Sequence, residues 1–137
     1  GGKVMKYIYS AVFERNDDGS KYYARVPDLP GCVSSGSDLQ DAIDEITDAA
    51  SGWLVVAEDD GINIPPATPQ DALEHEPGLL FSLIQIDTIA YRAMTDTQAV
   101  RKNVSLPAWM VALADKRGIN CSQVLQEGLR AKLSAPQ

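Results

Sequence analysis

The sequence predicts an α+β fold, in which an antiparallel sheet is covered by one long helix and followed by a small basic tail. Three observations predict it. Residues 5–26 hold two segments with strand-like alternation on either side of a turn. Residues 39–54 repeat apolar side chains at helical spacing. From residue 100 onward, a short alternating segment precedes two segments with helical spacing.

The first two strands form a predicted hairpin. Residues 5–14 alternate and are rich in aromatic and β-branched side chains, and residues 22–26 return after the turn sequence Asn-Asp-Asp-Gly-Ser at 16–20. Pro27 and Pro30 end the second strand because neither proline has an N–H to donate to a ladder. Residues 32–35 predict a short third strand that ends at Gly36.

An amphipathic helix of about five turns follows. Either Ser37 or Asp38 can cap it, and it ends before Asp59-Asp60-Gly61. Its polar side is acidic. Such a side is consistent with a solvated face or with a surface for a basic partner, and the helix pattern leaves both interpretations open.

The stretch between this helix and the tail is less regular. The proline-rich residues 64–69 predict a rigid connector, and Thr68 is expected to cap a short helix through residues 71–73. The strongly apolar residues 79–86 predict a central strand buried on both faces. Residues 87–94 fit either an extension of that strand or a helical turn, and residues 96–99 fit a hinge.

Charge divides the chain into two parts. From residue 100 onward six cations and two anions give a net charge of +4, whereas residues 1–99 carry the other six cations and seventeen anions, a net charge of −11. The basic part suits a polyanion and the acidic part suits a basic partner.

The tail begins with an alternating segment, which places Val104 and Leu106 on one face and polar side chains on the other. Pro107 starts a first helix, which ends with Lys116 and Arg117 before the stop residue Gly118. Asn120 is then the expected cap of a second helix.

One strand and two short helices cannot bury enough surface alone, so the tail requires a second copy of itself. The expected core of this homodimer comprises Val104, Leu106, Trp109, Leu113, Val124, Leu125 and Leu129. Two paired strands fit the major groove of DNA, and the bases would be read by Arg101, Asn103 and Ser105. The start of the second helix would bind phosphate, through Asn120, Cys121 and Ser122 together with Lys102.

No signature of catalysis accompanies these binding features. The two cysteines are far apart, His75 has no second ligand near it in sequence, and the carboxylates show no spacing that would bring them together on metal ions. We therefore expect no catalytic residues, no metal site and no cofactor. Without an apolar run of roughly 18 residues or a leader sequence, the expected location is cytoplasmic. Residues 1–4 are interpreted as an expression remnant preceding Met5.

Two family resemblances sharpen this interpretation. The stretch RKNVSLPAWMVALADKRGINCSQVLQEGL at 101–129 resembles the Arc/MetJ-type ribbon-helix-helix family, and the hairpin, PDLPGCVSSG at 27–36 and the following helix resemble HicB antitoxins. Together the resemblances cover nearly the whole chain from Met5. They imply a toxin-binding domain at 5–95, whose fold is similar to a truncated ribonuclease H, a hinge at 96–99 and a ribbon-helix-helix domain at 100–134.

The implied function is an antitoxin that holds a small HicA-type RNA-cleaving toxin inactive and represses its own operon. Toxin contacts are expected on the acidic helix, at Asp38, Asp41 and Glu45, or on the edge strands. The sequence leaves open whether two dimers associate into a tetramer. The alternative is a ribbon-helix-helix transcription regulator with a ligand-sensing N-terminal domain and no toxin. Ser105 departs from the family pattern as a weak base reader, and Lys102 lies on the face where an apolar residue is usual.

Overall fold

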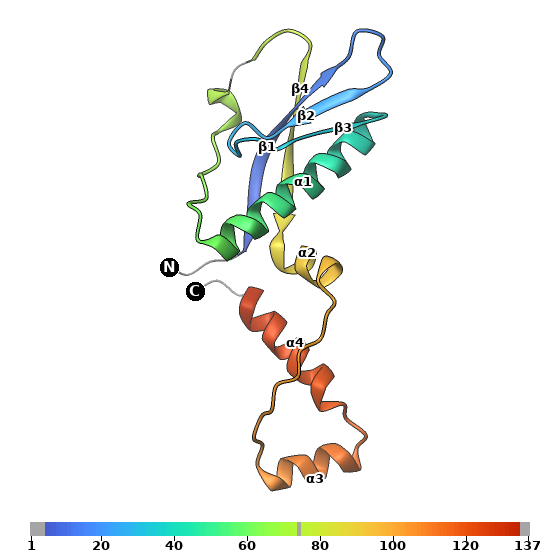
Figure 1. Cartoon of the computed structure of the whole chain (residues 1–137), viewed down its shortest axis with the longest axis vertical. Coiled ribbons are helices and arrows are strands. Elements are labelled where there is room, and N and C mark those ends of the chain that lie inside the picture. Colours follow the sequence, from blue (N-terminus) through green and yellow to red (C-terminus); the bar gives the residue numbers. More distant parts are fainter. Residues whose placement is uncertain (1–4, 74, 135–137) are drawn as a thin grey trace.

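The computed structural model describes residues 5–73 and 75–134, and residues 1–4, expected to be an expression remnant, lie outside this range. Its elements follow one another along the chain as shown in Figure 1. They are β1 (Lys6–Arg15), β2 (Tyr22–Arg25), β3 (Val33–Gly36), α1 (Leu39–Asp60), the 3-10 turn η1 (Gln70–Ala72), β4 (Leu79–Asp87), α2 (Thr88–Thr95), α3 (Ala108–Lys116) and α4 (Cys121–Ser134).

The four strands form one antiparallel sheet in the order β3-β2-β1-β4. The predicted hairpin is present, and its turn is closed by the side chain of Asn16, which accepts a hydrogen bond from Lys21 N at 3.1 Å. Gly19 has a φ of 72°, the left-handed conformation for which the turn needs glycine.

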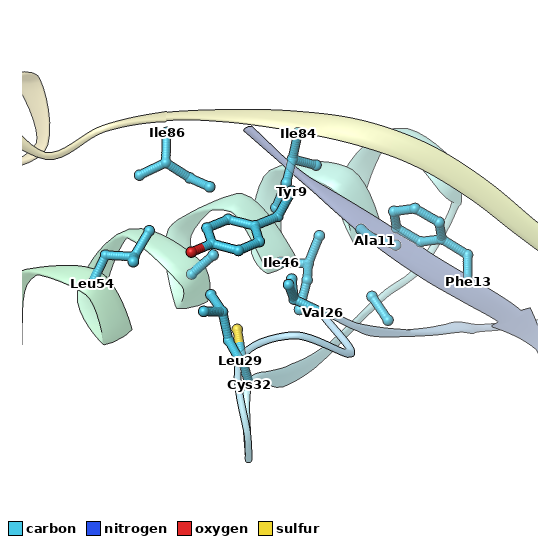
Figure 2. Close-up of a cluster of buried hydrophobic side chains, with 13 residues drawn as sticks. Tyr9, Ala11, Phe13, Val26, Leu29, Cys32, Ile46, Leu54, Ile84 and Ile86 are labelled. Atoms are coloured by element: carbon cyan, nitrogen blue, oxygen red, sulfur yellow. The ribbon is translucent and has the colours of Figure 1, made fainter. Parts of the chain in front are cut away.

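Helix α1 lies across one face of the sheet (Figure 1). Asp38 is its N-cap, because its Oδ1 accepts a hydrogen bond from Asp41 N at 2.7 Å, and Gly61 ends it with a φ of 67°. Figure 2 shows Ile46 and Leu54 of the helix beside Tyr9 of β1 and Ile84 of β4. No described helix or strand covers the opposite face of the sheet, on which Ile8 and Leu83 are more than half exposed.

The prediction that residues 79–86 form a central strand buried on both faces is wrong. Strand β4 lies at the edge of the sheet and, among the described residues, pairs only with β1. Only Ile84 and Ile86 of this strand are buried, because they face α1. Leu83 lies on the opposite face and is exposed, and Leu80 is exposed although it shares the face of Ile84 and Ile86. A continuous apolar run therefore reflects one covered face and an apolar but uncovered opposite face.

The expected cap by Thr68 is also wrong. Its hydroxyl and its backbone N–H both donate to the Asp28 carboxylate, forty residues earlier, and η1 has no side-chain cap. These two bonds fasten the connector to the loop between β2 and β3. Tyr9 holds the same connector, since its hydroxyl donates to the carbonyl of Pro65.

The ambiguous segment after β4 is helix α2, capped by Asp87, whose Oδ1 accepts a hydrogen bond from Ala90 N at 3.0 Å. An ion-pair cluster fastens this helix to the end of α1. Arg92 lies 3.0 Å from the buried carboxylate of Glu58 and 2.9 Å from Asp59. Glu58 also accepts hydrogen bonds from the hydroxyls of Tyr7 and Thr88. Burial and the Glu58 hydrogen bond raise the pKa of Tyr7.

The tail lies beyond α2, and α4 contacts α2 (Figure 1). Both predicted helices are present, with Gly118 at a φ of 66° between them and Asn120 accepting a hydrogen bond from Gln123 N at 3.1 Å. The predicted strand at residues 101–106 has no regular structure in the single chain. A ladder needs a second strand, and that prediction assigned the second strand to another copy.

Candidate partner-binding surfaces

Most of the exposed large apolar side chains among the described residues lie in the tail, from residue 100 onward. Within the described residues, neither α3 nor α4 has a buried side chain. An open groove of about 480 Å³ runs between the segment before α3 and the two helices. Six of the seven residues predicted as a dimer core line it, namely Val104, Leu106, Trp109, Leu113, Val124 and Leu125. The seventh, Leu129, is 52% exposed outside this groove.

The alternation predicted for the segment before α3 is visible in what lines this groove. Lys102 lies in the lining together with Val104 and Leu106. The three residues predicted to read bases, Arg101, Asn103 and Ser105, are exposed outside it. The apolar side chains of the segment therefore line the groove, and its polar side chains lie outside it.

The predicted phosphate-binding residues lie at the start of α4. The side chain of Asn120 is engaged as the helix cap, and Cys121 and Ser122 follow it in the first turn, both exposed. Amides of a first helical turn have no partner within their own helix, so these N–H groups suit a phosphate oxygen. Lys102 is placed on the groove side rather than with the base-reading residues.

The three predicted toxin-contact residues do not share one environment. Asp38 and Asp41 are engaged in the helix cap, since Asp38 accepts from Asp41 N and Asp41 accepts from Ser37 N at 2.9 Å. Glu45, one turn further along α1, is exposed. The capping bonds hold the carboxylates of Asp38 and Asp41 in place, whereas Glu45 takes no part in the cap.

A second groove, which sequence reasoning missed, lies where α1 meets the loop from Val26 to Cys32. Its volume is about 390 Å³, and its lining comprises Gly31, Cys32, Val33, Ala49, Gly52, Trp53, Val56, Ala57 and Ile62. The Trp53 indole donates to the carbonyl of Pro30 at 2.9 Å, which fixes the ring at one side of the groove. The helical pattern placed Trp53 with the core, and no local signal reveals that a loop leaves its flank open.

The loop that forms the other side of this groove is closed by its own backbone. Val26 N donates to Cys32 O at 3.1 Å, Leu29 N to Val26 O at 3.0 Å and Cys32 N to Leu29 O at 3.0 Å. Gly31 has a φ of 78°, which explains the glycine of the PDLPGC sequence. Burial raises the pKa of the Cys32 thiol, which packs against Leu29 in the core (Figure 2).

His75 and the carboxylates were the remaining candidates for chemistry. His75 is exposed, with Nε2 2.8 Å from the carbonyl of Gln70 and its ring against Phe81. In the described part of the chain no three His, Cys, Asp or Glu side chains gather as a metal site would require. No described helix is long and apolar enough to cross a membrane.

The described residues thus form an α+β protein, in which a four-stranded antiparallel sheet with one covering helix is joined to a basic tail with an open apolar groove. The family model described as HicB_like antitoxin of bacterial toxin-antitoxin system matches residues 9–128. The chain therefore belongs to the HicB-like antitoxin family, and it is an antitoxin of a toxin–antitoxin system.

Solved structures share this fold. A chain of a toxin–antitoxin complex from Streptococcus pneumoniae is 21% identical, with a TM-score of 0.53 over 93% of this chain and 99% of that one. The antitoxin HicB of Burkholderia pseudomallei is 24% identical, with a TM-score of 0.53 over 90% of this chain and 96% of that one. The N-terminal domain of the Burkholderia protein alone is 26% identical, with a TM-score of 0.52, and covers 59% of this chain and 99% of that domain.

A curated relative is a 14.9 kDa protein from the rep–hol intergenic region of Haemophilus phage HP1 (strain HP1c1). It is 24% identical over 112 residues, which cover 80% of each chain.

Proposed function

We propose that the chain neutralises a small, basic, RNA-cleaving toxin of the HicA type through its N-terminal domain and represses its own operon through its tail. In this proposal two tails form a ribbon-helix-helix dimer, whose paired strands enter the major groove of operator DNA. Arg101, Asn103 and Ser105 then meet base edges. Asn120, Cys121 and Ser122 hold phosphate, with Lys102 at the edge of the ribbon.

One observation carries the DNA-binding part. The segment before α3 has its apolar residues in an uncovered groove and Arg101, Asn103 and Ser105 outside it. If a second copy fills the groove, the polar residues of both copies lie together on the outside of the dimer. The net charge of +4 from residue 100 onward favours DNA there.

The N-terminal part of the proposal is supported by family membership and by charge. Residues 1–99 have a net charge of −11, which attracts a basic ribonuclease and is repelled by RNA or DNA. The relative from Streptococcus pneumoniae is itself part of a toxin–antitoxin complex.

Two assays on the full chain test the two parts separately. If a small basic protein is encoded beside it, adding the chain to that candidate toxin should abolish cleavage of a model mRNA at equimolar ratio. Fluorescence anisotropy with its own upstream DNA should show binding that weakens steeply as salt increases, because phosphate contacts release counterions. Cleavage that persists at saturating antitoxin rejects the first part, and equal affinity for unrelated DNA rejects the second.

The alternative function, a transcription regulator that senses a ligand and has no toxin, is an outcome of the same assays. It requires specific operator binding together with no effect on the toxin. The regulator alternative would also be favoured if the genes next to the one for this chain encode no small basic protein.

A further inference from the structure

We propose that the groove between α1 and the Val26–Cys32 loop is the docking site of the basic toxin, with an apolar side chain of the toxin inserted beside Trp53. The inference rests on the proposed function, since it names the surface through which that function would act. Of the contacts expected from the sequence on the acidic helix, it keeps Glu45 and leaves out Asp38 and Asp41.

The groove has the apolar centre of a binding site. Val56 and Ile62 are 52% and 51% exposed, respectively, although both line it. Ala49 and Gly52 add no bulk at its floor, so a partner side chain can approach the helix closely. Exposed apolar residues gathered around a partly buried tryptophan are typical of the few positions that dominate an interface.

Both walls of the groove are held before a partner arrives. The Trp53 indole is fixed by its bond to Pro30, and the loop opposite is closed by three backbone hydrogen bonds. Binding there orders little of the chain, and a preorganised surface gives higher affinity than a mobile one of equal area.

Charge around the groove selects a basic occupant. Helix α1 carries seven carboxylates and no lysine or arginine. Glu45 lies four residues before Ala49 and Asp60 four residues after Val56, so both exposed carboxylates lie on the helix face that lines the groove. Asp48 and Asp59 flank the same face, although Asp59 is already paired with Arg92.

The same rim argues against a second copy of the chain as the occupant. Two copies would bring their acidic rims together, and like charges across an interface are repulsive. A protein with lysine or arginine around an apolar side chain complements both the rim and the centre.

A pair of arginine substitutions tests the site. Val56→Arg places a bulky cation in the groove, and Leu83→Arg makes the same change in charge at a comparably exposed position on the uncovered face of the sheet. We expect Val56→Arg to weaken binding of the full chain to its cognate toxin by at least about tenfold in calorimetry and Leu83→Arg to leave it unchanged. Circular dichroism and Tm confirm that each variant folds.

A charge-reversed variant supplies a second readout if Val56→Arg does not fold. Glu45→Lys with Asp60→Lys should weaken the affinity for toxin and flatten its dependence on salt, because the rim attraction is lost.

Wild-type affinity in both the Val56→Arg and the charge-reversed variants overturns this inference and leaves the proposed function intact. A loss of affinity in Leu83→Arg alone overturns it in favour of the uncovered sheet face. A wild-type chain that does not bind the toxin overturns the proposed function and this inference together. If Val56→Arg lowers the mass of the free chain in light scattering, the groove is occupied by a second copy, which also overturns it.

Discussion

Cys32 shows how one residue of the PDLPGC sequence serves packing. Its side chain is 4% exposed, and burial raises the pKa of the thiol, so little thiolate forms at neutral pH. In a Cys121→Ser variant, where Cys32 is the only thiol, we expect slow reaction with a disulfide reagent at neutral pH. The reaction should accelerate only well above the usual thiol pKa. The same variant in denaturant is the control, and rapid labelling of the folded variant would contradict the prediction.

At Gly36 there is no room for a side chain. A Cβ added there would lie 2.2 Å from the backbone N of Ala42, at the start of α1. Gly36→Ala should therefore lower the free energy of unfolding by about 3 kcal/mol, because backbone has to shift. Urea denaturation measures it. Gly52→Ala is the control, since its Cβ would meet only the Tyr91 hydroxyl at 3.5 Å, and an equal loss there would refute the steric explanation.

Arg101 is the residue on which the proposed base recognition most depends. Arg101→Ala should remove an arginine contact to guanine from each copy and lower the preference for operator over unrelated DNA by tenfold or more, as ~1–3 kcal/mol per bidentate contact implies. The dimer should persist, because Arg101 lies outside the apolar groove. Competition binding and light scattering measure the two effects. An unchanged preference for operator would show that the polar side of the segment does not face the bases.

At the scale of elements, α2 is held by charge more than by apolar contact. Arg92 pairs with Glu58 and Asp59, and the side chain of Glu58 is 7% exposed. Arg92→Met should lower the free energy of unfolding by about 1–3 kcal/mol, less than for a fully buried pair because Arg92 and Asp59 are partly solvated. Amides of α2 should also exchange faster with solvent. Arg25→Met, at an exposed position of β2, is the control, and equal exchange in both variants would contradict the prediction.

The elements that the sequence predicted correctly are those specified locally. Asp38 and Asn120 act on backbone within four residues, so the starts of α1 and α4 follow from their own residues. Helix α1 was predicted to end before Asp59, but it continues to Asp60 and is capped by Gly61. The other errors concern partners far along the chain. Thr68 bonds Asp28 instead of capping its own helix, and β4 is an edge strand because β1 is its only partner among the described strands.

The same distinction applies to the candidate surfaces. The alternation of residues 101–106 predicted which of their side chains share a face, because side-chain direction in an extended segment follows from spacing alone. The groove beside Trp53 requires the loop at residues 26–32 to lie against α1, where Trp53 contacts Pro30 across 23 residues. No periodicity in either segment encodes that contact.

At the scale of the whole molecule, the N-terminal domain has a buried core of its own, whereas the two helices of the tail do not. The N-terminal half buries Phe13, Leu29 and Leu54 within one chain, whereas neither α3 nor α4 has a buried residue. In the proposed tail dimer Leu125→Asp would bury a charge at the shared core, so we expect it to abolish dimerisation and DNA binding and to leave the N-terminal domain folded. Light scattering and thermal unfolding measure this. Met94→Asp, on exposed α2, is the control, and a dimeric Leu125→Asp variant would exclude this groove as the interface.

The uncovered groove of the tail also has a consequence for how long the protein survives in a cell. If two tails complete each other, the fraction of chains with an open tail increases as the concentration of the protein falls. Proteases cut chains in proportion to the population of their open form, so we expect scarce copies to be degraded faster than abundant ones. The abundance of the antitoxin would then set its own half-life, and a brief pause in synthesis would be amplified into a loss of the whole pool.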